Sequence, residues 1–142
     1  MRVIEKAFAY VTSQGRLLVF EHVIFPAAGV QVPAGTILLG EDPAVAAVRE
    51  AREETGLDQF LDVQLLGISD FDARPHGKNE MHRRHFFNLP FVGSAPERWR
   101  HHELRPSDGG QDPIAFELYW IPLRKAAAHL AYDHGAFLER AR

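Results

Sequence analysis

A helix whose two ends are both marked in the sequence is the feature that most constrains how this chain folds. Asp42 is a favourable N-cap, Pro43 suits the first helical position, and Gly56 suits the left-handed residue that follows a helix. Between them the composition is mostly Ala, Val, Arg and Glu, and most of these residues favour helices. The sequence therefore predicts a helix over residues 43–55.

This helix has two faces of different chemistry. At about 100° per residue, one face gathers the residues expected to pack, and another sector gathers Glu50, Glu53 and Glu54. Spacings of three and four residues place such carboxylates about 5–6 Å apart, so they repel one another. A hard divalent cation such as Mg²⁺ relieves this repulsion, because it prefers carboxylate oxygens. The acidic face predicts a metal site. The packing face comprises Ala44, Ala47, Val48, Ala51 and Thr55.

Apolar or alternating segments on either side of the helix predict strands. An Ala-rich stretch with Lys and Arg over residues 123–138 predicts a C-terminal helix, interrupted near Gly135. Strands, a helix, further strands and a final helix indicate an α+β or α/β sandwich, without fixing the order of the strands. The predicted strands are residues 3–12, 16–20, 30–33, 61–71, 83–89, 98–104 and 114–121.

Composition excludes several classes of protein. With 142 residues, 46% of them hydrophobic, the chain suits one compact domain spanning residues 1–142. A net charge of −3 argues against general nucleic-acid binding, and the absence of cysteine excludes disulfides and a cysteine nucleophile. The N-terminus does not resemble a signal peptide, and we find no apolar run of membrane-spanning length. We therefore expect a cytoplasmic protein with no membrane partner.

Gly35 is followed after five residues by Glu41, and after seven more by Arg49-Glu50-Ala51-Arg52-Glu53-Glu54-Thr55-Gly56-Leu57. This segment, from Gly35 to Leu57, resembles the Nudix box of the MutT-like Nudix hydrolase family. Every fixed position of the family pattern matches, and Ala51 is merely smaller than the usual aliphatic residue. The resemblance implies a Nudix fold, an α/β/α sandwich with a mixed sheet between helices, in a single Nudix hydrolase domain.

The resemblance also implies an activity and roles for residues. The family hydrolyses diphosphate linkages in nucleoside diphosphates joined to another group, with Mg²⁺ or sometimes Mn²⁺ as cofactor. By position, Glu53 and Glu54 would bind metal, and Glu50 would be a metal ligand or the general base. A backbone carbonyl, that of Ala34 or Gly35, would add a ligand. The catalytic group would be Glu50, Glu53 and Arg49, with Arg49 orienting a carboxylate. Supporting roles fall to Gly35, Glu41 and Gly56.

Several features outside the box stay open. The base can also come from outside it, and Glu117, Glu103 or Asp112 could fill that role. A basic segment could bind the substrate phosphates, although such runs are often only solvated surface. Its candidate residues are Arg74, Lys78, Arg83 and Arg84. The histidine pairs 82/85 and 101/102 lack the spacing of a zinc site.

The sequence thus predicts a metal-dependent pyrophosphohydrolase that acts on a small nucleotide, sugar nucleotide, ADP-ribose or dinucleoside polyphosphate. Two other functions remain: a nucleotide-sensing module without catalysis, and an RNA 5′-end pyrophosphohydrolase, which the acidic balance disfavours. The oligomeric state is open, and a homodimer is compatible with the sequence.

Overall fold

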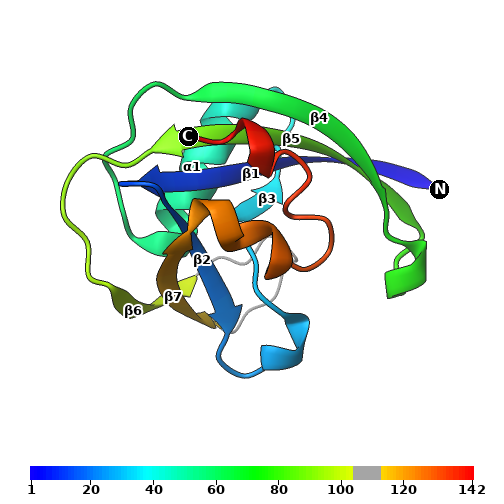
Figure 1. Ribbon diagram of the computed structural model, residues 1–142. Coiled ribbons are helices and arrows are strands. Elements are labelled where there is room, and N and C mark those ends of the chain that lie inside the picture. The colour runs from blue at the N-terminus through cyan, green and yellow to red at the C-terminus, as the bar shows by residue number, and fades with distance from the viewer. Residues whose placement is uncertain (104–112) are drawn as a thin grey trace.

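A computed structural model describes residues 1–103 and 113–142. Within these ranges a seven-stranded mixed sheet runs in the order β4-β5-β1-β2-β7-β6, and β3 pairs with β1 beside this path. Figure 1 shows α1 behind the sheet and the C-terminal segment in front of it. The strands are β1 (Arg2–Ser13), β2 (Arg16–His22), β3 (Ala34–Thr36), β4 (Gln64–Asp72), β5 (Glu80–Pro90), β6 (Arg98–Glu103) and β7 (Ile114–Pro122), and the helix is α1 (Pro43–Thr55).

The centre of the sheet is a parallel pair formed by β1 and β5. Their register runs from Arg2 opposite Glu80 to Thr12 opposite Pro90. The middle of β1 is buried on both faces, as its continuous apolar run requires. Ala7, Ala9 and Val11 belong to one core cluster, while Phe8 and Tyr10 belong to the other. The two faces of β1 therefore support two separate cores.

Small side chains hold α1 against the sheet. Ala46, Ala47 and Ala51 are fully buried in the same core cluster as Ala7 and Ala9. Alanine on both surfaces leaves little bulk between the helix and the strand, so their backbones approach closely. Helix α1 begins and ends at the residues that the sequence predicts. Of its predicted packing face, Ala47, Ala51 and Thr55 are buried, whereas Ala44 and Val48 are only partly buried.

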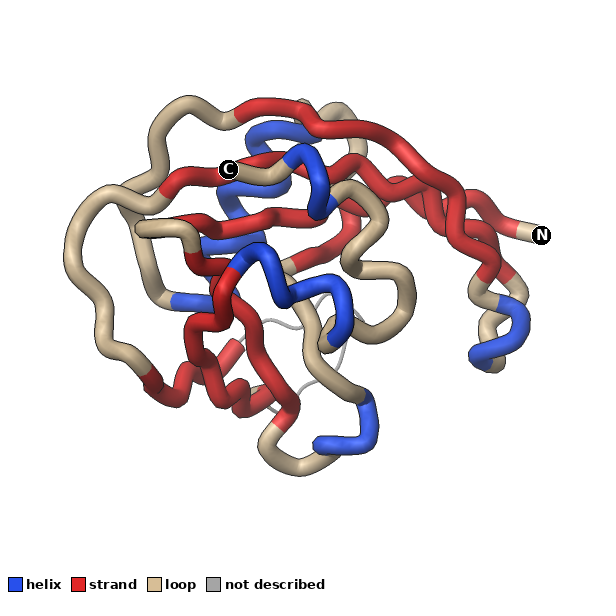
Figure 2. The backbone as a smooth tube through the Cα atoms, viewed as in Figure 1, coloured by secondary structure: helices blue, strands red, loops and turns tan. Residues whose placement is uncertain are grey.

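The opposite face of the sheet is covered differently from the prediction. The helix expected over residues 123–138 is wrong: the chain forms 3-10 turns at Leu123–Ala128 and Leu138–Arg140. Tyr132 and Asp133, between these turns, have left-handed backbone angles. Figure 2 shows the two short helical turns and the loop that joins them in front of the strands. The α+β class is nevertheless confirmed by the mixed sheet with one main helix.

Tertiary hydrogen bonds explain why the Ala-rich segment does not stay helical. The backbone N–H of Ala131 donates to the Val30 carbonyl, and the Tyr10 hydroxyl donates to the His134 carbonyl at 2.6 Å. The Val32 N–H donates to Nδ1 of His134, whose ring is buried. The first two bonds take backbone groups that a helix would use, and the third holds the His134 side chain against the sheet, so contact with the sheet overrides helix propensity.

The predicted strands mostly match, with shifts at their ends. Strands β1 and β2 form the expected hairpin, turning at Gln14 and Gly15, which both have positive φ angles. The strand predicted at 30–33 lies later, at Ala34–Thr36, and only isolated bridges occupy the predicted residues. The structure shows no helix long and apolar enough to cross a membrane within the described ranges.

The buried Tyr10 hydroxyl predicts a measurable contribution to stability. It donates to the His134 carbonyl and accepts the Phe137 N–H at 3.3 Å. Replacement Tyr10→Phe leaves both backbone groups without this partner, so we expect a loss of about 1–3 kcal/mol in the free energy of unfolding. Urea denaturation measures it, with Tyr132→Phe, at a residue that is 38% exposed, as the matched control. A Tyr10→Phe loss no larger than that of the control would contradict the prediction.

Candidate active site

The local sequence shapes the loop and helix that carry the site. The Asp42 carboxylate accepts the Ala44 N–H at 2.8 Å, which caps the first turn of α1. At the other end Gly56 has φ of 79°, and its N–H donates to the Arg52 carbonyl. This left-handed conformation is the one that glycine adopts at least cost. The helix ends are therefore fixed by the residues that predicted them.

Three buried carboxylates lie together beside α1. Glu50 and Glu54 come from α1, and Glu103 comes from the end of β6. One oxygen from each lies within 4.8 Å of the others, and all three residues are at most 5% exposed. Glu53 is on the same side of the helix but lies at the solvent edge, with 39% of its side chain exposed. The cluster thus joins part of the predicted acidic face to a residue almost fifty positions away.

Gly35 and Ala34 form the wall against which two of these carboxylates rest. A Cβ atom at Gly35 would occupy the space that the Glu50 carboxyl group fills. The Ala34 N–H donates to Glu54 Oε1 at 2.7 Å. The glycine of the motif is therefore required by close approach, since its φ angle is an ordinary one. This arrangement brings the backbone of β3 to the carboxylates, where a carbonyl ligand from Ala34 was predicted.

Arg49 connects the loop before the helix to the carboxylates on it. Its Nε and Nη2 donate to the two oxygens of Glu41 at 2.8 and 3.0 Å, and Nη2 also donates to the Thr36 carbonyl. Its Nη1 donates to Glu50 Oε1 at 2.8 Å and lies 3.5 Å from Glu53 Oε2. Such a planar group with several donors can orient several acceptors at once. The structure therefore places Arg49 where it can orient Glu50, and it places Glu41 where it connects the preceding loop to Arg49.

Burial controls the protonation of the cluster. It raises the pKa of Glu50 to about 7, against the opposing effect of the Arg49 hydrogen bond and charge. Burial, reinforced by the charges of Glu50 and Glu103, also holds the pKa of Glu54 well above its usual range. By contrast, the hydrogen bonds from Arg49 lower the pKa of Glu41. The raised pKa values mean that the positive charge near Glu50 and Glu54 is too small to stabilise both of them in the ionised form.

The donor set fits a hard divalent cation. Within the part of the chain that the structure describes, Glu50 Oε2 is buried without a hydrogen-bond partner. A buried carboxylate oxygen in this state is costly, and a cation would compensate for it. Oxygen donors from Glu50, Glu54 and Glu103 are of the kind that Mg²⁺ and Mn²⁺ prefer.

The candidate bases outside the box are placed differently from one another. Glu103 joins the cluster, whereas Glu117 forms ion pairs with Arg98 and Arg100 at 3.4 and 3.0 Å. Glu117 alternates with Phe116 and Leu118, which face the core on the α1 side, so it faces the other way. Asp112 lies outside the described residues. Of the described pair, Glu103 is the residue that the structure brings to the site.

The four candidate substrate-binding cations do not converge. Arg83 and Arg84 are neighbours on β5 and point to opposite faces. Arg84 is buried between the rings of Phe8 and Phe71, while Arg83 is half-exposed near Glu5 and Asp70. Two exposed candidates remain: Arg74, which forms an ion pair with Asp72, and Lys78, near the start of β5.

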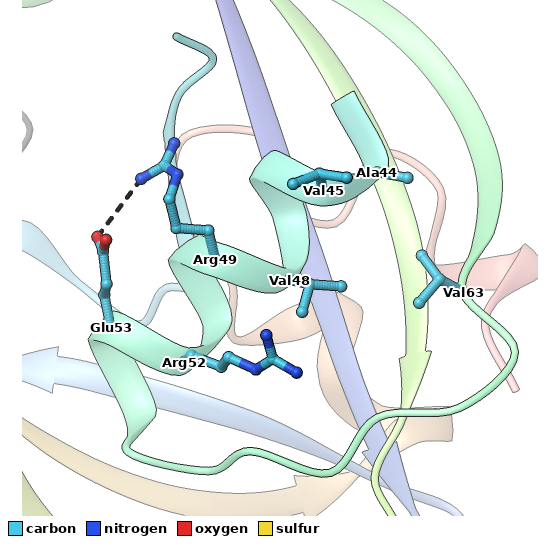
Figure 3. A pocket seen from close by; sticks show the side chains of 7 residues that line it. All are labelled: Ala44, Val45, Val48, Arg49, Arg52, Glu53 and Val63. Atoms are coloured by element: carbon cyan, nitrogen blue, oxygen red, sulfur yellow. Dashed lines mark hydrogen bonds and ion pairs between the residues drawn. The ribbon is translucent and has the colours of Figure 1, made fainter. Parts of the chain in front are cut away.

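A groove of about 570 Å³ lies along α1, and the three carboxylates of the cluster are not among the described residues that line it. Val45, Val48 and Val63 line it, with Arg52 beside them and Arg49 and Glu53 at one edge. Figure 3 shows the valines on one flank of the helix and the Arg49–Glu53 contact on the other. At about 100° per residue, Val48 and Glu54 are roughly 120° apart around the helix. The groove and the carboxylate cluster are therefore separate features.

Comparison with known proteins identifies the family. The NUDIX domain matches residues 5–141, so the chain belongs to the NUDIX domain family. A Mycobacterium tuberculosis relative that carries a mutator-protein name, MutT4, is 32% identical over 101 residues, or 71% of this chain and 36% of that protein. An RNA pyrophosphohydrolase of Sphingopyxis alaskensis is 32% identical over 105 residues, or 64% of this chain and 66% of that protein. The chain thus spans about a third of the length of the Mycobacterium relative and about two thirds of the length of the Sphingopyxis relative.

Solved structures show the same fold at low sequence identity. A MutT NUDIX hydrolase from Burkholderia pseudomallei aligns with a TM-score of 0.68 at 20% identity, covering 98% of each chain. A NUDIX hydrolase from Nitrosomonas europaea aligns with a TM-score of 0.65 at 23% identity, covering 92% of this chain and 80% of the other. The predicted family and fold are confirmed.

The raised pKa of Glu50 predicts how pH changes the stability of the metal-free protein. The folded state binds this proton more tightly than the unfolded state, so its favourable contribution is complete below about pH 4.5 and is lost as the pH rises through about 7. Glu50→Gln removes the titration and keeps an acceptor for Arg49. At pH 7.5 we expect this variant to exceed the wild type in unfolding free energy, by at most about 3 kcal/mol.

The measurement is urea unfolding of both proteins with chelator present, from pH 4.5 to 7.5. Burial lowers the pKa of His134 to about 3, so this residue makes the unfolding free energy rise with pH, opposite to the effect of Glu50. Because His134 is present in both proteins, the difference between their profiles isolates Glu50. Parallel profiles for the wild type and Glu50→Gln would show that Glu50 does not titrate in this way. Added Mn²⁺ should stabilise the wild type more at pH 7.5 than at pH 5.

Proposed function

We propose that this chain is a metal-dependent hydrolase of diphosphate linkages in nucleoside-diphosphate-linked small molecules, with Mg²⁺ as cofactor and Mn²⁺ as its substitute. The observation that carries the proposal is the buried cluster of Glu50, Glu54 and Glu103 beside the Arg49 network. Membership of the NUDIX domain family supports the same activity.

In this proposal, different residues bind the metal, position the carboxylates and shape the wall of the site. Glu50, Glu54 and Glu103 would hold the metal, with Glu53 at the open edge and the Ala34 carbonyl as a further ligand. A bound divalent cation would neutralise diphosphate oxygens and lower the pKa of a bound water. Arg49 keeps Glu50 in place through its hydrogen bond and keeps the preceding loop in place through Glu41. The wall at Gly35 keeps the carboxylates close to the backbone of β3.

Two carboxylates of the box fit the role of general base. Glu53 is open to solvent and can accept a proton from an attacking water, whereas Glu50 is buried with one unpartnered oxygen among the described residues. The variants Glu50→Gln and Glu53→Gln distinguish the general base from a metal ligand. Loss of the base removes the acidic limb of the pH–rate profile, whereas loss of a ligand weakens metal binding.

The catalytic proposal is favoured over a nucleotide-sensing module that only binds. Three carboxylates buried within 4.8 Å of one another destabilise a fold, and a module that only binds nucleotide does not need them. This chain also keeps every carboxylate of the box. Tight nucleotide binding without any product in Mg²⁺ or Mn²⁺ would favour the sensor. The cytoplasmic location and a homodimer stay predictions.

A second activity has one observation in its favour. The Sphingopyxis relative is an RNA pyrophosphohydrolase, and removal of pyrophosphate from a 5′-triphosphate end uses the same chemistry. The net charge of −3 provides little general attraction for RNA. Pyrophosphate release from 5′-triphosphate RNA, compared with release from a nucleoside triphosphate at equal concentration, decides between the two substrates.

Replacement Glu53→Gln tests the proposed activity directly. The side chain keeps its size at a partly exposed position, so the fold should persist, while the lost charge should lower kcat by about 10²–10⁴-fold. The measurement is a hydrolysis screen in Mg²⁺ and in Mn²⁺ over nucleoside triphosphates, sugar nucleotides, ADP-ribose and dinucleoside polyphosphates. Glu139→Gln, at an exposed carboxylate remote in sequence from the box, is the control.

The two outcomes of that screen differ clearly. A metal-dependent product that Glu53→Gln abolishes and Glu139→Gln retains would establish the enzyme class and its preferred substrate. Full activity of Glu53→Gln would remove this residue from the catalytic group, and silence of the wild type on every compound would count against the activity itself.

A further inference from the structure

One face of β6 is directed at the end of α1. Along this strand the exposed residues Arg98, Arg100 and His102 alternate with Trp99, His101 and Glu103, which are partly or fully buried. The second set lies on the α1 side, where Trp99 packs against the core cluster and Glu103 joins the carboxylates. The three inward residues of a short edge strand thus all meet the helix that carries the box.

Two of these side chains bind carbonyl groups in the last turn of α1. Trp99 Nε1 donates to the Thr55 carbonyl at 2.9 Å, and His101 Nε2 lies 2.8 Å from the Glu53 carbonyl. Because a carbonyl oxygen only accepts, His101 must carry its proton on Nε2 and donate it there. The last four carbonyls of a helix lack donors within the helix. These two side chains supply donors that the turn itself lacks.

The His101 ring also fits against the turn that ends the helix. A Cβ atom at Gly56 would lie 3.0 Å from His101 Nδ1 and 3.1 Å from its Cε1. Gly56 is therefore needed both for its left-handed backbone angles and for the space that the ring occupies. The glycine of the box and a histidine 45 positions later form one contact.

We propose that His101 is a positioning residue that holds the end of the helix and the Glu103 carboxylate in fixed relation. The inference rests on the proposed function, in which these carboxylates bind metal. His101 bonds the backbone of Glu53, and Glu103 stands two residues further along the same face of the same strand. The hydrogen bond therefore sets how far Glu103 lies from Glu50 and Glu54.

His101 matters because the carboxylates of the cluster come from two different elements, α1 and β6. Two of the carboxylates belong to α1 and the third belongs to an edge strand, so mutual repulsion tends to separate the elements. The Trp99 and His101 bonds oppose this separation at the end of the helix nearest the cluster. Without the His101 donor, the Glu53 carbonyl would accept a hydrogen bond from water instead. Glu103 would then be held less firmly at the position from which it can bind the same metal ion as Glu50 and Glu54.

The experiment compares three variants of the full chain. His101→Ala removes the donor, His101→Gln keeps an N–H donor on a side chain of similar reach, and His102→Ala changes the exposed neighbour. Mn²⁺ affinity is measured by electron paramagnetic resonance of the free ion, and kcat and KM are measured on the substrate that the screen identifies. Hydrogen exchange of the Gly56 and Leu57 amides is followed in the metal-free protein.

We expect His101→Ala to weaken Mn²⁺ binding about 10-fold and to lower kcat about 10–100-fold, with KM changed less than about 3-fold. The Gly56 and Leu57 amides should exchange faster, since they lie in the turn against which the ring packs. His101→Gln should recover most of the Mn²⁺ affinity, and His102→Ala should match the wild type.

The proposal is overturned if His101→Ala binds Mn²⁺ within about twofold of the wild type, or if His101→Gln is as impaired as His101→Ala. Should His101→Ala fail to fold, His101→Gln alone decides, because it must then bind Mn²⁺ nearly as the wild type does. Failure of the proposed function is seen separately: the wild type would bind Mn²⁺ and depend on His101, yet hydrolyse no diphosphate.

Discussion

The guanidinium group of Arg49 is the interaction on which the rest of the site depends. It binds both oxygens of Glu41, the Thr36 carbonyl and Glu50, and so joins the loop before α1 to the middle of the helix. Without this charge, Glu50 would be a buried carboxylate that has lost its ion-pair partner, an arrangement that is strongly destabilising. Because Glu50 in turn rests on Gly35, the position of β3 relative to the helix follows from the same network. A lysine could not make these contacts together, since it offers one point charge instead of a planar fork.

Stability and function make opposite demands on the carboxylates. Burial raises the pKa values of Glu50 and Glu54, which means that the fold alone would favour their protonated forms near neutral pH. Metal binding requires the charged forms, so ligand and proton compete for the same oxygens. The charged form of the cluster therefore destabilises the fold, and either protonation or a bound cation would relieve this cost. Perturbed protonation of this kind is typical of functional sites, and it separates these residues from the exposed carboxylates of the surface.

The sequence predicts what is local and fails where distant contacts decide. Helix α1 is predicted to the residue, because its cap, its first-turn proline and its terminal glycine are all local signals. The C-terminal helix is wrong because bonds to Val30, Val32 and Tyr10 hold that segment in another conformation, and no local pattern reports them. Glu103 and Glu117 look equivalent in sequence, since each is a glutamate on a strand. They differ in the face to which they point, which depends on the register of β6 against β7.

The same distinction applies to the chemistry. The box supplies Arg49, Gly35 and the helical glutamates from a continuous segment, so the sequence alone predicts a metal site on this helix. The cluster is completed by Glu103 and is bordered by Trp99 and His101, all from one edge strand distant in sequence. The alternation along β6 predicts that Trp99, His101 and Glu103 share one face of the strand. Only the structure shows that this face lies against the end of α1. The box is thus a necessary half of the site, and the geometry of the other half depends on how one edge strand is held against the helix.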